Sequence, residues 1–343
     1  MNRKVTMRDV AKYAGVSVAT VSNVLNKVSK TSDDTRERIL KAIEETQYKL
    51  DYTARCLSMG KSNLIGVMFP ITEKGDEPSI LLRNNPFFSE FTSGIEYVAR
   101  KQGYDILLTG IESGQKCKEW ISKRNLDGII LLGINPESFF NEMKDVKLPI
   151  VLTDTYEEYS TKFHRVMVDD EMGGYIATKH LLDSGHRNIA IASGRIGEVG
   201  VNLRRYEGYK RALNEVGIDI NKKFIIEENV SFDGGYRIGK RIIKLDSKIT
   251  AVFAVADIVA FGIIKAFNKN GKSVPVDYSI VGFDDLKMCE YITPELTTIR
   301  QDIFKKGMVS AEAIIDDIEF GIVTSETVML PVELINRGSV KKI

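Results

Sequence analysis

The sequence predicts an N-terminal all-α domain with a helix-turn-helix, followed by an α/β body built on two parallel, doubly wound sheets. In the first fifty residues, short amphipathic segments surround a glycine turn. The rest of the chain alternates apolar runs with helical stretches, which is typical of parallel sheets covered by helices on both faces. The length of 343 residues exceeds one ordinary domain and leaves room for two such sheets.

The composition is that of a soluble globular protein, with 43% hydrophobic and 28% charged residues and a net charge of +1. The charge is unevenly distributed. Residues 1–61 carry twelve Lys and Arg against seven Asp and Glu, so they hold +5 and the remainder holds −4. A basic N-terminal segment on a mildly acidic body fits a nucleic-acid-binding module, although chance variation gives the same imbalance.

Targeting and metal-binding signals are missing from the sequence. There is no apolar run of membrane-spanning length and no secretory segment after the first ten residues. Cys56, Cys117 and Cys289 lack metal-ligand spacing and are interpreted as reduced thiols of a cytoplasmic protein. The three histidines form no ligand motif, so we expect no metal and no cofactor.

Capping signals divide the N-terminal segment into three helices. Thr6 with Asp9 three residues later resembles a capping box, and the first helix should run to about Tyr13. Ala14-Gly15 is the expected turn, because glycine tolerates a left-handed backbone. The hydroxyls of Ser17 and Ser32 should cap the second and third helices, the third ending at Thr46. The expected buried residues are Val10, Ala11, Val21, Val24, Leu25, Ile39, Leu40 and Ile43.

The second helix has unusually small polar side chains on its opposite face. Val18, Ala19, Ser22 and Asn23 would let that face lie close to base edges in a major groove. Ser17, Thr20 and Ser22 could donate to phosphates. The spacing alone also fits a helical bundle with no role in DNA binding.

Longer segments resemble the lac repressor family of bacterial transcription regulators. The likeness lies in "TMRDVAKYAGVSVATVSNVLN", "TRERILKAIEETQY" and "TARCLSMGKSNLIGV", and it extends over essentially the whole chain. The resemblance implies that Val18, Ala19 and Asn23 read bases. Asn23 stands where the family usually has arginine, and asparagine suits adenine whereas arginine suits guanine. The residues expected to contact DNA are Thr6, Ser17, Val18, Ala19, Thr20, Ser22, Asn23, Asn26, Ala54, Arg55 and Leu57.

Residues 1–49 are the expected DNA-binding domain, and residues 50–61 are a linker of marginal helix stability. The resemblance implies that this linker folds on DNA and that Leu57 enters the minor groove. A buried hydrophobe at a domain boundary is the alternative for Leu57. The family commonly has Pro-Asn after the third helix, where this chain has Leu50-Asp51.

Residues 62–343 form the expected body, which by resemblance is a two-lobed, periplasmic-binding-protein-like domain that binds an effector and dimerises. We expect lobe 1 at about 62–164 and 297–325, and lobe 2 at about 165–296 and 326–343. The expected strands are "NLIGVMF", "DILLTG", "DGIILLG", "PIVLTD", "VMVDD", "NIAIASG", "AVFAVAD" and "SIVGFDD". The expected helices include "SEFTSGIEYVARKQG", "GGYIATKHLLDSGH" and "RRYEGYKRALNEVG".

Polar residues follow several of these strands, as ligand sites in open α/β sheets require. The resemblance places an arginine that holds effector hydroxyls opposite an acid and a polar residue. The expected effector-binding residues are Phe87, Phe88, Asp154, Arg205, Asp257, Asp284 and Gln301. Two alternatives stay open: Asp257 could cap the following helix, and Arg205 could pair with Glu207 or Glu198 at the surface. Ala256 replaces the Asn or Ser that the family often has there.

The expected function is an allosteric, homodimeric repressor of carbohydrate-utilisation genes that binds operator DNA and a small effector, expected to be a sugar or sugar derivative. The chain ends without a leucine-heptad tail, so a dimer is expected. Residues 72–85 are longer than the family's usual loop and could be a lid or a surface insertion. The alternatives are a solute-binding protein without a regulatory role, and a regulator of a non-sugar ligand or a protein corepressor. An enzyme is not expected, because no catalytic set is present.

Overall fold

The computed structural model describes residues 5–25, 31–48, 61–71, 82–133, 136–245, 248–321 and 325–343. The chain divides into two units, Met1–Ser62 and Asn63–Ile343. This division falls next to the expected start of the body at residue 62. The expected contacts of Asn26, Ala54, Arg55 and Leu57 lie outside the described residues, as do most of the linker and residues 72–81.

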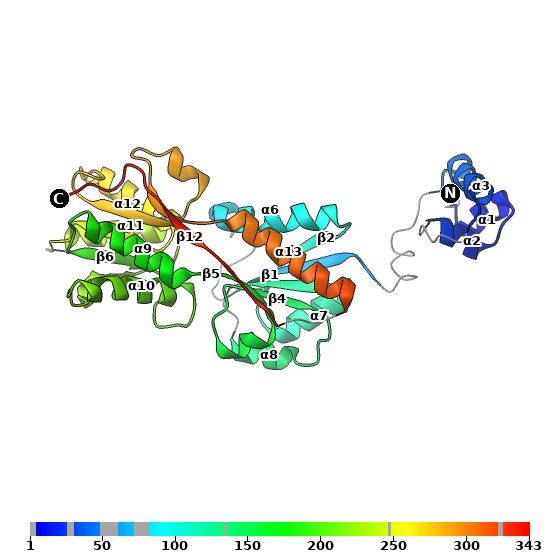
Figure 1. Ribbon diagram of the computed structural model, residues 1–343, viewed down its shortest axis with the longest axis horizontal. Coiled ribbons are helices and arrows are strands. Elements are labelled where there is room, and N and C mark those ends of the chain that lie inside the picture. Colours follow the sequence, from blue (N-terminus) through cyan, green and yellow to red (C-terminus); the bar gives the residue numbers. More distant parts are fainter. Residues whose placement is uncertain are drawn as a thin grey trace. The chain divides into compact units, whose positions relative to one another are not determined.

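The first unit contains α1 (Met7–Ala14), α2 (Val18–Leu25) and α3 (Asp33–Thr46) (Figure 1). The expected caps are confirmed. The Asp9 carboxylate accepts from the Thr6 N–H at 2.8 Å, and Ser17 Oγ accepts from the Thr20 N–H at 3.1 Å. Gly15 has a φ of 64°, a left-handed conformation that favours glycine in the turn between α1 and α2.

The small core of this unit fixes the orientation of α2. Val10, Val21 and Ile39 are fully buried, and Leu25 and Ile43 pack against them at its edge. The prediction for Leu40 was wrong, because its side chain is 53% exposed. Residue 40 follows the fully buried Ile39 by about 100° around the helix, which turns its side chain away from the core. The opposite face of α2 remains at the surface.

The second unit has two six-stranded sheets, as the alternation of strands and helices predicts. The first sheet has the order β11-β5-β4-β3-β1-β2, and the second has the order β12-β10-β9-β8-β6-β7. The strands of the first are β1 (Leu64–Pro70), β2 (Asp105–Ile111), β3 (Gly128–Leu132), β4 (Ile150–Thr153), β5 (His164–Val168) and β11 (Thr327–Leu330). Those of the second are β6 (Ile189–Ser193), β7 (Ile225–Glu227), β8 (Ala251–Ala254), β9 (Ser279–Asp284), β10 (Thr297–Gln301) and β12 (Val332–Ile335).

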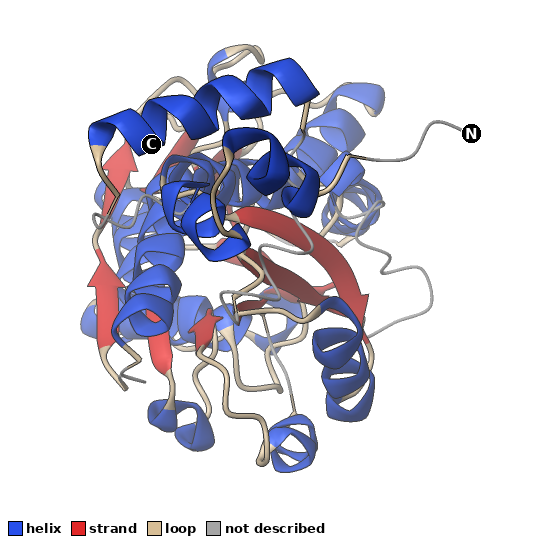
Figure 2. Ribbon diagram, turned by 90° about the vertical axis from the view of Figure 1, so that its right-hand side faces the viewer, coloured by secondary structure: helices blue, strands red, loops and turns tan. Residues whose placement is uncertain are grey.

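Helices flank both sheets, so the strands lie in an interior layer (Figure 2). In the first lobe, α6 packs against α13 and α7 packs against α8; in the second, α9 packs against α10 and α11 against α12. Their bounds are α6 (Pro86–Lys101), α7 (Gly114–Arg124), α8 (Glu137–Met143), α9 (Asp170–Asp183), α10 (Val201–Glu215), α11 (Phe232–Lys244), α12 (Asp257–Lys269) and α13 (Ile303–Phe320). Short 3-10 helices lie at η1 (Glu158–Lys162), η2 (Lys222–Phe224) and η3 (Lys287–Glu290).

The chain passes between the lobes three times, and each passage comes one strand later than expected. β5 and β11 belong to the first sheet, whereas β10 belongs to the second. The passages therefore lie between β5 and α9, between β10 and α13, and between β11 and β12. The expected lobe limits are corrected accordingly. They fail because a strand that ends at a passage is apolar in either sheet, so its pattern does not reveal which sheet it joins.

All the strand pairs are parallel except β10 with β12, which is antiparallel. β7, β10, β11 and β12 are absent from the list of expected strands. β11 and β12 are short and partly exposed, so they lack the continuous apolar run of a central strand. Parallel strands bring their carboxyl ends to the edge where open α/β sheets bind ligands, and Asp154 and Asp284 stand at the ends of β4 and β9.

Candidate functional sites: an exposed helix face and an interlobe cavity

α2 carries five of the seven described residues that are expected to contact DNA, namely Val18, Ala19, Thr20, Ser22 and Asn23. Val18 is 40% exposed, Ala19 and Asn23 are exposed, and Ser22 is half-buried. The hydroxyls of Ser17 and Thr20 lie 2.8 Å apart. Ser17 Oγ is therefore engaged by its own helix cap, and its remaining hydrogen-bonding capacity faces solvent together with the exposed Thr6. The side chains on the exposed face of α2 are short, which suits close approach to a groove.

A second site is a cavity of about 190 Å³ between the two lobes of the body. This volume is below the roughly 300–1,000 Å³ typical of drug-sized ligands, so the cavity fits a small molecule. Its lining residues are Asn85, Phe87, Phe88, Leu132, Gly133, Asp154, Val201, Asn202, Arg205, Val230, Val255, Ala256, Asp284 and Gln301. The structure thus brings six of the seven expected effector-binding residues to one place.

The two carboxylates of the cavity stand at strand ends in unusual backbone conformations. Asp154 follows β4 with a φ of 57°, and Asp284 ends β9 with a φ of 123°. Such conformations cost about 1–3 kcal/mol each and cluster at ligand-binding sites. The next residue, Asp285, also has a positive φ of 58°. The sequence shows the acids but not this geometry, because φ depends on the surrounding contacts.

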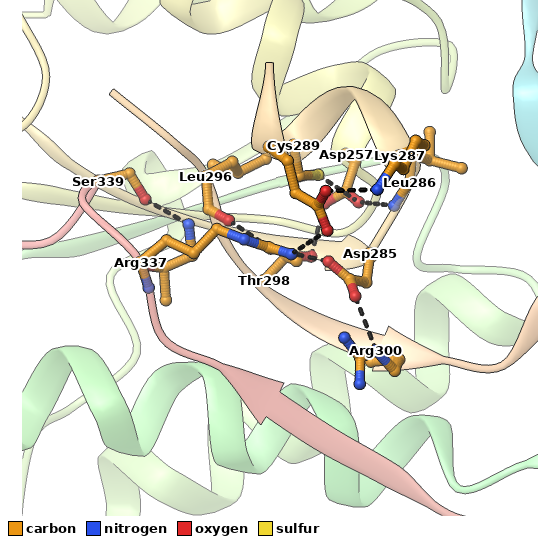
Figure 3. Close-up of polar contacts among 12 residues, drawn as sticks. Asp257, Asp285, Leu286, Lys287, Cys289, Leu296, Thr298, Arg300, Arg337 and Ser339 are labelled. Atoms are coloured by element: carbon orange, nitrogen blue, oxygen red, sulfur yellow. Dashed lines mark hydrogen bonds and ion pairs between the residues drawn. The ribbon is translucent and has the colours of Figure 1, made fainter. Parts of the chain in front are cut away.

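Contacts of Asp285 hold the backbone beside Asp284 (Figure 3). The Asp285 carboxylate pairs with Arg300 Nε at 2.7 Å and with Arg337 Nη1 at 2.7 Å. Arg337 also donates to the Leu296 carbonyl at 2.9 Å. These contacts tie the turn after β9 to β10 and to the chain after β12, which opposes relaxation of the strained Asp284.

Arg205, on α10, is a buried cation surrounded by acceptors. Its Nε donates to Asp170 at 2.7 Å, its Nη1 donates to the Val255 carbonyl at 2.5 Å, and Nη1 lies 3.9 Å from Asp284. Its guanidinium carbon lies 3.6 Å from the centre of the Phe283 ring, a cation–π contact. The surface alternatives are not realised, because Glu207 pairs with Lys210 and Glu198 pairs with Arg195.

Two glycines allow α9 and α10 to approach closely enough for the Arg205–Asp170 pair. A Cβ on Gly174 would lie 2.1 Å from the Arg205 carbonyl oxygen, and one on Gly208 would lie 2.0 Å from the Glu171 carbonyl oxygen. Larger residues at either position would push the helices apart. The glycines therefore set the depth at which Arg205 enters the cavity.

The sequence interpretation missed Lys306, a lysine that is 1% exposed. It pairs with Asp154 Oδ1, lies 3.5 Å from Gln301 Oε1 and has its Nζ 5.6 Å from the centre of the Phe87 ring. Gln301 in turn donates from Nε2 to Asp284 at 2.6 Å. A signal was present in the sequence: Lys306 shares the spacing of Ile303, Gly307 and Ser310, which form the buried face of α13.

Asp170 and Tyr156 were also missed. Asp170 begins α9 and is 1% exposed, and the Tyr156 hydroxyl, from the loop after β4, donates to its carboxylate. The same hydroxyl lies 3.2 Å from the Val168 carbonyl. Adjacent Asp169 instead caps α9 by accepting from the Met172 N–H at 2.9 Å. The two neighbouring acids thus point apart, as expected for consecutive residues, and Asp170 joins the cavity network.

Burial raises the pKa values of two carboxyls at the cavity, Asp284 and Asp170. Burial raises the pKa of Asp284 to about 6, and the Arg205 cation opposes this shift. Burial also raises the pKa of Asp170, again opposed by Arg205. Three carboxyl groups, Asp154, Asp170 and Asp284, thus lie in ion pairs with two basic groups, Arg205 and Lys306.

Asp257 does not belong to the cavity, so its expected effector contact is corrected. Its side chain is fully buried in a separate cluster (Figure 3). Oδ1 lies 2.6 Å from Thr298 Oγ1, and Oδ2 accepts from the Leu286 N–H at 2.8 Å and the Cys289 thiol at 3.1 Å. Asp257 is also the first residue of α12 rather than its cap, which is Ala256. It joins α12 to the loop after β9.

Two negative observations apply to the described ranges. No group of three or more His, Cys, Asp or Glu side chains there is arranged to hold a metal ion. No helix within those ranges has the length and apolar character needed to cross a membrane.

Comparisons with known proteins agree with this arrangement of two sites. A model described as "Bacterial regulatory proteins, lacI family" matches residues 6–51, and a "Periplasmic binding protein-like domain" matches residues 178–340. The "HTH-type transcriptional repressor PurR" of Vibrio campbellii is 32% identical over 98% of this chain and 99% of its own length.

Solved structures are similar over both units or over the body. The lac repressor dimer bound to operator and the anti-inducer ONPF matches with a TM-score of 0.85 and 26% identity, covering 99% of this chain and 100% of that one. A LacI family regulator from Enterococcus faecium with bound ribose matches with a TM-score of 0.70 and 33% identity, covering 82% of this chain and 99% of that one.

Proposed function

The chain belongs to the lacI family of bacterial regulatory proteins, and we propose that it represses carbohydrate-utilisation genes in response to a sugar bound between its lobes. It is a ligand-responsive, DNA-binding repressor that acts as a homodimer on operator DNA. Its family consists of transcriptional regulators, and we assign it no catalytic step. Because it acts on bacterial DNA, its place of action is the cytoplasm.

The observation that carries the proposal is the interlobe cavity. Carboxylates, an arginine and amides converge on it beside the aromatic Phe87 and Phe88. This set of groups suits a monosaccharide. Carboxylates accept hydrogen bonds from neighbouring sugar hydroxyls, amides both donate and accept them, and an aromatic ring packs against the apolar face of the sugar. The ribose bound to the E. faecium relative supports the same ligand class. We assign effector contact to Phe87, Phe88, Asp154, Arg205, Asp284 and Gln301.

The effector acts through the two lobes. A ligand shifts an equilibrium only if it binds one lobe arrangement better than the other. The cavity takes residues from both sheets, so its occupation depends on the distance between the lobes. In a dimer, that distance sets the spacing of two α2 helices on a palindromic site.

An effector test follows from this mechanism. We expect a palindromic duplex, selected with the full-length protein, to be bound at least a hundredfold more tightly than random DNA at fixed salt. One sugar of a panel should change that affinity by about 5–150-fold, in either direction. Fluorescence anisotropy of labelled duplex checks both. Affinity that no sugar changes would contradict a carbohydrate effector, and equal affinity for random DNA would contradict the regulator itself.

The base preference at Asn23 gives a second expected result. Selection from random duplexes should return adenine at the pair that faces Asn23, because an asparagine side chain makes two hydrogen bonds to adenine. In N23R the same selection should return guanine, with discrimination of about 1–3 kcal/mol between the two bases. Sequencing of the bound pools measures this. Guanine in both pools would contradict base reading by residue 23. The matched control is K12M, a substitution on α1, which should return the same base as the wild type.

A further inference from the structure

The cations beside the cavity are both compensated by carboxylates. Arg205 is the one cation among the described residues that line it, and its guanidinium is engaged by Asp170, Asp284 and the Val255 carbonyl. Lys306 lies behind the wall, where Asp154 separates it from the cavity. A ligand therefore meets the carboxylates of Asp154 and Asp284 rather than an unpaired positive charge.

The hydrogen bonds of Gln301 fix the rest of the polar pattern. Its Oε1 faces Lys306 and its Nε2 donates to Asp284. Lys306 thus contacts Asp154 and Gln301 at once, and it orients the Asp154 carboxylate and the Gln301 amide on the same wall. The N-cap residues of α10 and α12 are Gly200 and Ala256, and neither makes a side-chain cap hydrogen bond. Their first N–H groups offer donors to ligand hydroxyl oxygens.

We propose that the buried Lys306–Asp154 pair makes this cavity selective for an uncharged polyhydroxylated ligand over its phosphorylated form. The inference rests on the sugar effector proposed above and specifies its charge. Lys306 is a positioning residue: it offsets the charge of Asp154 and holds Oδ1, which leaves the carboxylate to accept from ligand hydroxyls. It does not contact the ligand itself.

A phosphate group is disfavoured by the same arrangement. Its charge would stand beside two carboxylates in a site shielded from water, where like charges repel strongly. The helix N-termini attract anions, but each carries only about half a charge, whereas the Asp154 carboxylate stands between Lys306 and the ligand. A neutral sugar meets neither effect, and it donates to both carboxylates.

The two partners of the pair should change selectivity in opposite directions. D154N leaves the Lys306 cation uncompensated next to the cavity, which favours a phosphorylated sugar. K306M leaves the Asp154 anion uncompensated, which disfavours the phosphate further and favours an amino sugar. The double variant D154N/K306M removes both charges. If the pair had only a structural role, each substitution would lower the affinity for all the ligands together. Opposite shifts in selectivity therefore distinguish the proposed electrostatic role from a structural one.

The experiment uses the full-length protein and isothermal titration at pH 7.5 and fixed salt. The probes are D-ribose with D-ribose 5-phosphate, and D-glucose with D-glucosamine and glucose 6-phosphate. We expect the wild type to prefer the neutral sugar it binds over the phosphate form by at least about tenfold. The preference should fall by about tenfold in D154N and rise in K306M, with a gain for the amino form.

A control variant and the possible outcomes complete the test. K116M breaks the exposed Lys116–Glu112 pair and should leave selectivity unchanged. If a single variant fails to fold by circular dichroism, the double variant, which removes both charges of the pair, must show a smaller preference for the neutral sugar than the wild type, and a preference equal to that of the wild type overturns the inference. Wild-type affinity for a phosphate equal to that for its parent sugar, or shifts of the same sign in both single variants, overturns the inference and leaves the sugar effector intact. If the wild type binds neither the sugars nor their phosphates, the proposal of a sugar effector is itself wrong.

Discussion

Replacing Arg205 by leucine is expected to lower the free energy of unfolding of the body by about 3–5 kcal/mol and to abolish the response to the effector. Arg205 is 5% exposed, and its Nε is 2.7 Å from Asp170. Without it, Asp170 and Asp284 are buried near each other with no cation from α10. Removing one partner of a buried pair is more costly than removing the whole pair, because the remaining charge stays out of water.

The test compares three variants by urea unfolding and by effector titration. R205L should show the full loss of stability. R205L/D170N should recover part of it, because one buried anion is removed, but should not recover effector binding. R211L is the matched control, since Arg211 pairs with Glu171 on the same two helices at a partly exposed position. Its expected loss is below about 1 kcal/mol. A similar loss in R205L and R211L would contradict the role given to the buried pair.

Much of this architecture is readable from the sequence, because local signals fix local structure. Thr6, Ser17 and Ser32 provide caps, and Gly15 provides a left-handed turn, so three helices follow with their ends. The apolar runs around Val67, Ile130 and Val151 identify central strands for the same reason. In these cases the physical cause lies within a few residues of its effect.

The cavity could be predicted only in part, because its chemistry depends on distant partners. Asp284 and Arg205 follow from the resemblance to the family, whereas Asp170 and Lys306 require knowledge of what faces them across two lobes. Asp257 ends a strand-like run just as Asp154 does, but its carboxylate meets Thr298 and the loop after β9 rather than the cavity. Sequence position alone does not tell which side of the strand end a carboxylate faces.

The raised pKa of Asp257 also leads us to expect that the free energy of unfolding depends on pH. Burial, and next the nearby charge of Asp284, raise the pKa of Asp257 to about 8. The folded chain therefore keeps this proton between about pH 4 and pH 8, where an unfolded chain has lost it. Since the folded state binds more protons in that window, the free energy of unfolding falls as the pH rises, by up to about 1.4 kcal/mol per unit. The stabilisation is complete below pH 4 and is lost above pH 8.

Substitution by asparagine isolates this contribution. D257N keeps the shape, its amide oxygen can accept from the Leu286 N–H, and its NH₂ can donate to Thr298 Oγ1. Relative to the wild type, the variant should gain up to about 1.4 kcal/mol per pH unit between pH 5 and pH 8 and be the more stable of the two at pH 9. Its remaining slope should come from the other buried carboxyls with raised pKa values, Asp284 and Asp170. Urea unfolding followed by circular dichroism from pH 5 to 9 measures both curves. Parallel curves between pH 6 and 8 would show that the proton on Asp257 is not the one that folding retains.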